Sequence, residues 1–159
     1  MKKIKGFTLI ELLIVIGIIA ILAAIIYVAV DPARRLQEAR DAERWASVNA
    51  ILNAVLKFTV DNSGTLPAGL GNASSGIYYV LGAGVSGSCL NANCGALVNS
   101  EDCMNLDTQL VDEYISAIPQ DPSSGTINNT DYYIMKSSNG RITVGACDPE
   151  RATSISVSR

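Results

Sequence analysis

The chain has 159 residues, 48% of them apolar, with a formal net charge of −3 and no histidine. The lack of histidine removes the commonest general base and metal ligand, and an acidic chain is a poor general ligand for nucleic acid, because neutralising phosphates needs clustered Lys and Arg. No nucleophile elbow, phosphate-binding loop or dense metal-ligand cluster stands out, so the composition argues against an enzyme and no cofactor is expected.

The apolar residues are concentrated at the start of the chain. Residues 1–6 form a basic leader, and residues 7–30 are apolar apart from Glu11. Residues 12–30 contain no charge and no proline, and as a helix they would extend about 28 Å, the thickness of a hydrocarbon core. We therefore expect residues 7–30 to form a membrane-spanning helix. We expect the leader lysines to hold the N-terminus in the cytoplasm and to place the rest of the chain outside. These lysines are Lys2, Lys3 and Lys5.

The residues around Glu11 resemble a known processing signal. The stretch Lys5-Gly6-Phe7-Thr8-Leu9-Ile10-Glu11 is similar to the class III leader of type IV prepilins and of type II secretion pseudopilins. The resemblance implies that a prepilin peptidase cuts between Gly6 and Phe7, methylates the new Phe7 amine and leaves the apolar segment on the mature protein. A conventional signal peptide is cut after its apolar run, and we do not expect that here because the run passes directly into an amphipathic helix.

Glu11 is costly inside a membrane, so it predicts a function. Cleavage creates an α-amino group at Phe7, one helical turn before Glu11, and the spacing permits contact within one chain. The family resemblance implies that the pair instead joins neighbouring subunits, with Glu11 of the incoming copy meeting the Phe7 amine of the assembled one. A wrong register would leave a buried charge without compensation. The alternative is a glutamate that reaches the lipid headgroups.

Residues 31–62 are predicted to form a second, amphipathic helix, the stem. Asp31 and Pro32 suit the N-cap and first helical position, and Pro32 would bend a helix continuing through it. Gly64 and Pro67 predict the end of the stem. The apolar residues at helical spacing are Leu36, Ala39, Trp45, Val48, Leu52, Val55 and Phe58.

The stem also carries the one basic cluster of the chain. Its members are Arg34, Arg35, Arg40 and Arg44, interleaved with Glu38, Asp41 and Glu43. Mixed charges of this kind indicate a helix surface that faces water or lipid headgroups. A direct nucleic-acid ligand is not expected of it.

Residues 63–159 are predicted to form a small head. Residues 132–136 and 141–146 are β-rich, and the Asn139-Gly140 pair between them is typical of a hairpin. Residues 154–158 alternate and predict a third strand. The predicted class is α+β, in which a long N-terminal helix, half membrane-spanning and half amphipathic, packs on a small antiparallel sheet. This is also the pilin fold.

Two further parts of the head have weaker patterns. Within residues 67–103 the run Ile77–Leu81 predicts a short strand or helical turn, and the rest of that region is predicted to be loop. Residues 104–117 have apolar residues at helical spacing, which predicts a short helix ended by Pro119. Asn72 and Asn128 each begin an N-x-[ST] triplet, a pattern of low specificity.

The four cysteines are even in number and lie in the predicted extracytoplasmic part, which favours two disulfides. Three pairings are possible, and we favour Cys89–Cys94 with Cys103–Cys147. A four-cysteine zinc site is the alternative, although the spacings lack the usual C-x₂-C knuckles.

One acidic region raises the question of calcium. Residues 118–122 and 131–133 resemble the proline-containing loop and strand of major type II secretion pseudopilins and of some bacterial pilins. The resemblance to those pseudopilins raises calcium, which they bind through acidic loop residues near the C-terminus. The oxygen donors available here are Asp121, Asp131, Asp148 and Glu150. The acidic loop is not dense, so we expect no metal and favour a surface role for these side chains.

The leading functional hypothesis is a structural subunit of a type IV pilus. Its expected partners are copies of itself in a helical filament, the prepilin peptidase, the assembly machinery and, before assembly, inner-membrane lipid. Its expected location is the inner membrane, in a single pass, and then an extracellular pilus. The alternatives are a pseudopilin in a periplasmic pseudopilus and a minor pilin with a binding head.

Overall fold

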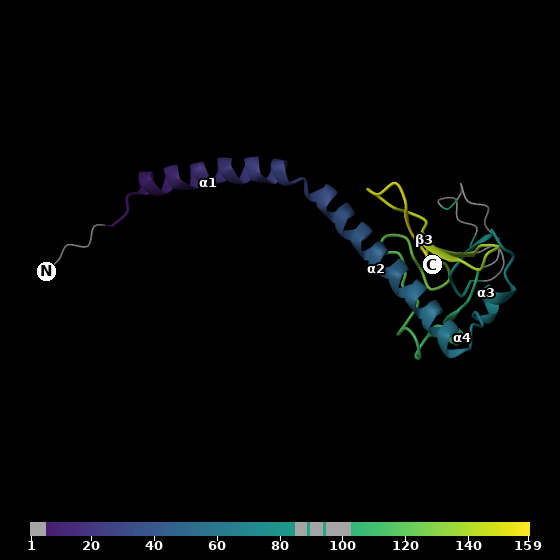
Figure 1. The fold of residues 1–159 in the computed structure, drawn as a ribbon. Helices are drawn as coiled ribbons and strands as arrows, with labels where there is room; N and C mark the ends of the chain where they lie inside the picture. The colour runs from purple at the N-terminus through teal and green to yellow at the C-terminus, as the bar shows by residue number, and fades with distance from the viewer. Residues whose placement is uncertain (1–5, 85–88, 90–93, 95–102) are drawn as a thin grey trace. The chain divides into compact units, whose positions relative to one another are not determined.

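The computed structural model describes residues 6–84, 89, 94 and 103–159. The predicted leader residues 1–5 and most of residues 85–102 lie outside this part. The chain divides into two compact units, one up to Gln37 and one from Glu38 to Arg159. Figure 1 shows the helices and strands in chain order.

Two helices make up the N-terminal part of the chain. Helix α1 spans Leu9–Val30 and helix α2 spans Pro32–Asp61. Asp31 between them has φ +45° and ψ 79°, a left-handed backbone that interrupts the helix. Its carboxylate accepts a hydrogen bond from the Arg34 N–H at 3.4 Å. The predicted interruption at Asp31 and Pro32 is therefore confirmed, and its cause is the ring of Pro32, which cannot donate to the preceding turn.

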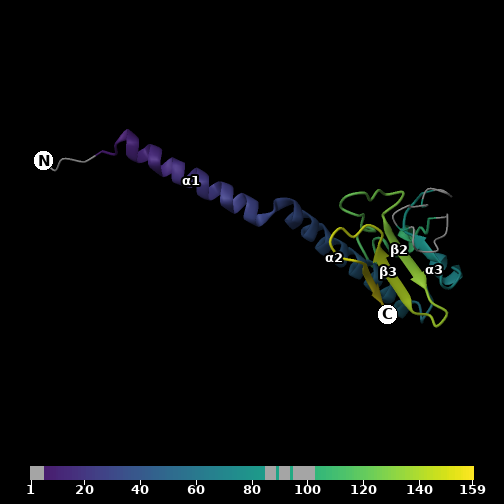
Figure 2. The ribbon, with the colours of Figure 1, turned by 90° about the horizontal axis from the view of Figure 1, so that it is seen from above.

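The head sheet has four antiparallel strands. They are β1 (Tyr78–Val80), β2 (Tyr132–Lys136), β3 (Ile142–Ala146) and β4 (Ile155–Ser158), in the spatial order β1-β2-β3-β4. Figure 2 shows β2 and β3 side by side. The predicted hairpin and the last strand are confirmed, as is the strand reading of the run around Tyr79. Gly140 has φ +79° in the β2–β3 turn, a conformation that glycine adopts at no steric cost.

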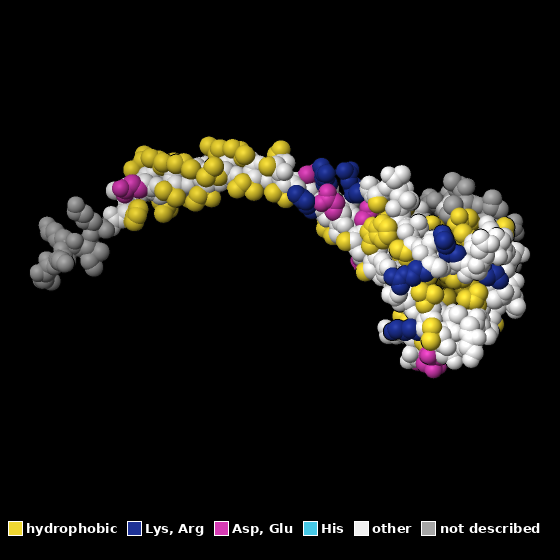
Figure 3. Space-filling view, in the orientation of Figure 1, with side chains coloured by type: hydrophobic (Ala, Val, Ile, Leu, Met, Phe, Trp, Pro, Cys, Tyr) yellow, Lys and Arg dark blue, Asp and Glu magenta, His cyan; other side chains and the backbone are white. Residues whose placement is uncertain are grey.

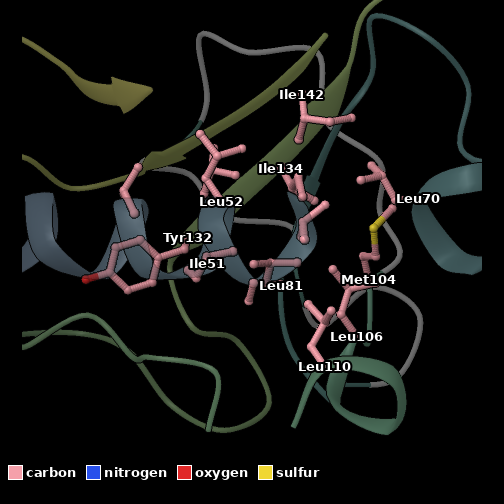
Figure 4. Packing of buried hydrophobic residues seen from close by; sticks show 14 of the residues in the cluster. Ile51, Leu52, Leu70, Leu81, Met104, Leu106, Leu110, Tyr132, Ile134 and Ile142 are labelled. Atoms are coloured by element: carbon pink, nitrogen blue, oxygen red, sulfur yellow. The ribbon is translucent and has the colours of Figure 1, made fainter. Parts of the chain in front are cut away.

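The main core lies between α2 and one face of the sheet. Val48, Ile51 and Leu52 of α2 are at most 1% exposed, and they share a cluster with Ile134 and Val144 of the sheet. Figure 4 shows Ile51, Leu52 and Ile134 packed with buried side chains of other segments, among them the short helix α4 (Asp107–Leu110) and the residues just before it. The further members drawn there are Leu70, Leu81, Met104, Leu106, Leu110, Tyr132 and Ile142. Burial of this apolar area is the main source of stability for a head of this size.

The opposite face of the sheet has a smaller cluster with aromatic packing. Tyr78 and Tyr133 meet edge to face, with ring centroids 5.3 Å apart. Tyr133 is paired in register with Gly145 on β3. The Tyr133 ring occupies the place where a Cβ of residue 145 would lie. Gly145 therefore lets an aromatic ring lie directly over the strand.

Two sequence predictions for the head need correction. The helix predicted over residues 104–117 is a single turn, α4 (Asp107–Leu110). It ends because Val111 is extended and Asp112 has φ +75°, after which Val111 and Ile115 form a bridge. The region predicted to be loop after Pro67 begins with a short helix, α3 (Ala68–Asn72), whose Leu70 is fully buried. Apolar spacing identified buried positions here, but it did not identify the backbone that buries them.

Candidate processing and assembly site

The predicted processing site lies at the start of α1, where the backbone is exposed. Gly6 and Phe7 precede the helix, and the Phe7 side chain is 85% exposed. Thr8 is the N-cap, with an extended backbone at φ −84° and ψ 153°. The bond between Gly6 and Phe7 therefore lies outside the helix, in a segment that an enzyme can bind in extended form.

Glu11 forms a capping box with Thr8 at this end of the helix. The Glu11 Oε2 atom accepts hydrogen bonds from the Thr8 N–H and the Thr8 hydroxyl, both at 2.7 Å, and the Glu11 N–H donates to Thr8 Oγ1 at 3.3 Å. A carboxylate in the first turn also interacts favourably with the helix dipole. The side chain is thus held one residue away from Phe7, where cleavage would create an amine. Oε1 takes part in neither hydrogen bond.

Helix α1 has an apolar surface on all sides. None of its residues is buried in the structure. Figure 3 shows hydrophobic side chains along its whole length, with the acidic group at its start. Within the part of the chain that the structure describes, α1 is the one helix long and apolar enough to cross a membrane. A helix that is apolar all round requires lipid or protein around it.

A second site, in the head, was not predicted from the sequence. The guanidinium of Arg44 on α2 is fully buried and donates to both carboxylate oxygens of Asp121, at 2.6 and 2.9 Å. It also donates to Asp41 at 2.9 Å, to Glu150 at 3.0 Å and to the Ser123 hydroxyl at 2.8 Å. We call these five residues the Arg44 cluster. It joins α2 to two segments that lie far away in the sequence.

Asp41 fixes the segment before β4 in the same cluster. Its carboxylate accepts backbone N–H groups from Glu150 at 2.9 Å, Arg151 at 2.7 Å and Ala152 at 2.8 Å. Arg40 adds a two-pronged pair with Glu150. Three successive N–H groups bound to one carboxylate hold this loop rigidly against α2, which positions the β4 strand that follows.

The charges of the cluster shift the ionisation of its members. Burial acts to raise the pKa of Asp121, but hydrogen bonds from Arg44 and Ser123 outweigh it and bring that pKa to about 2. Burial likewise acts to raise the pKa of Asp41, and the three backbone N–H groups and Arg44 bring it to about 2. The same carboxylates raise the pKa of Arg44 further above its ordinary value, against the effect of its burial. All three groups are therefore ionised at neutral pH.

The whole basic cluster is predicted from the sequence to face water or lipid headgroups, and for Arg44 this prediction is wrong. Arg34 and Arg35 are exposed and Arg40 is partly exposed, but Arg44 is 0% exposed and Asp41 is 6% exposed. The reason is position, because Arg44 follows the same stripe of α2 as Val48 and Ile51. The sequence signal that would have identified it is this placement of Asp41 and Arg44 on the apolar stripe, three residues apart.

The structure gives the calcium candidates partners within the protein. Asp121 and Glu150 meet at the Arg44 guanidinium, so an internal cation occupies the position between them. Asp148 accepts a hydrogen bond from the Ser124 hydroxyl at 3.2 Å, and Asp131 is buried with φ +58°. In the described residues, no group of three or more potential ligands is placed to hold a metal ion.

The disulfide pairing favoured from the sequence is wrong. The structure joins Cys89 to Cys103 and Cys94 to Cys147, with Cα–Cα distances of 5.1 and 4.6 Å. Cys103 lies beside β1 because Met104 donates its N–H to the Val80 carbonyl and bridges with Leu81. All four thiols are engaged in these bonds, which leaves none for the zinc alternative.

One local feature of the N-terminal site was accessible from sequence. The spacing Thr8-x-x-Glu11 is the capping-box pattern, and it predicts the hydrogen bonds that the structure contains. The sequence reading assigned Glu11 to a charge pair and omitted this local role. In the uncleaved chain Phe7 has a peptide N–H and no amine. Glu11 lies in the first turn of α1, directly after Phe7 and Thr8.

Comparison with known proteins supports the reading of this end of the chain. Residues 1–27 match the family model described as the prokaryotic N-terminal methylation motif. Comparisons with curated proteins and with solved structures gave no match. The α+β head and the apolar N-terminal helix are consistent with the pilin fold. Residues 1–27 thus contain the class III leader of type IV pilins and pseudopilins, and this motif supports a pilin-like or pseudopilin protein.

Proposed function

We propose that the chain is a structural subunit of a type IV pilus, made as a membrane-anchored precursor. A prepilin peptidase cuts between Gly6 and Phe7 and methylates the Phe7 amine, and α1 then leaves the lipid to pack against α1 helices of other copies. The observation that carries this proposal is the placement of one carboxylate, Glu11, in the first turn of a helix with no buried residue.

The chemistry of assembly follows from that placement. In lipid, the ionised Glu11 is tolerated near the interface because Thr8 and the helix N-terminus satisfy it. In a helix bundle, the Phe7 amine of a neighbour supplies the opposite charge, and the free Oε1 atom is available to accept from it. A copy in the wrong register buries the carboxylate without this cation, at a cost of several kcal/mol. Glu11 therefore selects the correct axial position.

The orientation in the membrane follows from the basic leader and the disulfides. Lys2, Lys3 and Lys5 favour a cytoplasmic N-terminus, and two disulfides favour an oxidising compartment for the head. Both observations support a head that lies outside the cytoplasm.

A pseudopilin of a type II secretion system is the second candidate. It would use the same processing motif in residues 1–27, and it agrees with the resemblance of residues 118–122 and 131–133 to a loop and strand that major pseudopilins share with some bacterial pilins. Long surface filaments in electron micrographs favour the pilus, whereas loss of secretion on deletion, without such filaments, favours the pseudopilus.

The test is a pair of substitutions expressed in cells that contain a prepilin peptidase and the assembly machinery. We expect Glu11→Ala to be cleaved at Gly6 and to remain in the membrane, but to give few filaments. Glu43→Ala is the matched control, because Glu43 is an exposed carboxylate on α2. Mass analysis of the N-terminus measures cleavage, and sheared protein measures filaments. Normal filaments from Glu11→Ala would refute the proposed role of the carboxylate.

A further inference from the structure

Strand β4 forms one margin of the head sheet and has an unpaired edge. In the described part of the chain it pairs only with β3, from Ala146↔Ile155 to Thr143↔Ser158. Figure 2 shows this margin beside β3, near the C-terminus. A strand at the edge of a sheet presents backbone N–H and C=O groups that another strand can bind.

The hydrogen-bond pattern identifies which groups face outward. Ile142 and Arg159 exchange both backbone hydrogen bonds, at 2.7 and 2.9 Å, so they are a hydrogen-bonded pair of the antiparallel ladder. Hydrogen-bonded pairs recur at every second residue, so Val157 and Ile155 also bond to β3. The N–H and C=O groups of Ser156 and Ser158 therefore point away from the sheet. Neither residue has another backbone hydrogen bond among the described residues.

This edge is ordered, and no described residue gives it the usual protection. Edge strands are commonly shielded by lysine, proline, a bulge or a covering helix. The sequence of β4, Ile-Ser-Val-Ser, contains neither lysine nor proline. Ile155 is 1% exposed, and the loop before the strand is fixed by the three N–H groups bound to Asp41. Because the edge is already ordered, a partner would not have to provide the free energy of ordering it.

The charges beside the edge select the chemistry of the partner. Residues 151–159 contain two arginines and no acidic residue. Arg151 precedes β4 and Arg159 follows it, and both are exposed. Arg141, also exposed, lies at the same end of the sheet as Arg159. Pairing of two β4 edges would bring the Arg159 of each copy toward the Arg151 of the other, which is unfavourable.

We propose that the β4 edge binds an extended acidic segment of another protein by strand addition. The outward groups of Ser156 and Ser158 supply main-chain hydrogen bonds, and Arg151 and Arg159 pair with carboxylates at the ends of the added strand. The partner is thus a flexible or edge-strand segment with acidic residues on either side of a β-forming core. This surface belongs to the unit from Glu38 to Arg159, and the proposal does not depend on filament assembly.

The probe is the acetylated peptide Glu-Val-Thr-Val-Thr-Val-Glu, added to the full chain in detergent micelles. We expect saturable binding by fluorescence anisotropy and slower amide exchange at Ser156 and Ser158, without a change at Val157. The same peptide with Lys in place of Glu is expected to bind at least tenfold more weakly. Equal binding of the two peptides, or protection confined to other residues, would overturn the proposal.

Proline substitution provides a sharp control. Ser156→Pro removes an outward N–H but no ladder hydrogen bond, so an edge strand tolerates it. We expect it to abolish peptide binding while the urea midpoint of the head stays near that of the parent. Ser156→Ala keeps the N–H and is expected to bind normally, and Ser158→Pro tests the same point if Ser156→Pro does not fold. Unchanged binding in a folded proline variant would refute strand addition. Slow exchange at both serines that depends on protein concentration without peptide would assign the edge to a second copy and overturn the proposal as well.

Discussion

Replacing Arg44 with methionine removes the cation on which two buried carboxylates depend. Arg44 and Asp121 have no exposed side-chain area, and Asp41 has 8%. Methionine fills much of the space of the arginine stem but leaves Asp121 without a charge partner. Removing one member of a buried pair costs about 3–5 kcal/mol. Since the free energy of unfolding of a typical domain is about 5–15 kcal/mol, the variant head would be close to the limit of stability.

The measurement is urea unfolding of the full chain in detergent micelles, followed by tryptophan fluorescence. Trp45 is the single tryptophan and lies next to Arg44 on α2. Arg40→Met is the matched control, because Arg40 is partly exposed and, among the described residues, forms its ion pair with Glu150. We expect this control to lose much less stability than Arg44→Met.

The pH dependence of the variant distinguishes loss of the cation from loss of packing. Without Arg44, burial raises the folded-state pKa of Asp121 above its unfolded value, so the variant becomes more stable as the pH falls toward that unfolded value. In the parent the free energy of unfolding instead falls as the pH is lowered, because Asp41 and Asp121 have depressed pKa values. A variant within about 1 kcal/mol of the parent, or one with the parent's slope, would refute the argument.

Three further predictions concern the head. In the parent, Asp41 and Asp121 have a pKa of about 2 against about 3.9 when unfolded. The stabilisation that these two carboxylates provide is therefore complete above about pH 5 and is lost as the pH falls through about 2. Urea midpoints measured at a series of pH values would show this loss, and a midpoint that does not change with pH would contradict it. Gly145→Ala places a methyl group within the Tyr133 ring, and we expect the free energy of unfolding to fall by about 1–3 kcal/mol. The loss should be smaller when Tyr133 is also replaced by Ala. Losses that simply add in the double variant would contradict the contact. Peptide mapping of the oxidised protein should give the pairs Cys89–Cys103 and Cys94–Cys147, and a Cys89–Cys94 peptide would show that the structure is wrong there.

The elements that sequence predicted well are those decided by local chemistry. The break at Asp31 and Pro32 depends on one ring, and the β2–β3 hairpin depends on Asn139-Gly140 between two β-rich runs. The capping box at Thr8 and Glu11 is equally local, but it was not predicted. Each of these follows from residues within a few positions of one another.

The features that sequence did not predict depend on distant partners. Arg44 is buried because Asp121 and Glu150 reach it from 77 and 106 residues away, and no local pattern contains that information. The cysteine pairing depends on the bridge that places Met104 beside β1. The helix predicted over residues 104–117 is shortened because Tyr114 and Ile115 fold back onto the core next to Phe58, with the Phe58 and Tyr114 rings 5.5 Å apart.

The hydrogen bonds between Asp41 and the loop before β4 also affect the order of folding. The three N–H groups that Asp41 accepts come from residues 109 to 111 positions later in the chain. During synthesis, Asp41 cannot complete these contacts until residue 152 has been added, and Arg44 likewise depends on the later residue Glu150. Contacts of such long sequence separation form late and slowly. The contacts between Asp41 and the loop before β4 therefore close late, although Asp41 is among the first residues of the head to be made.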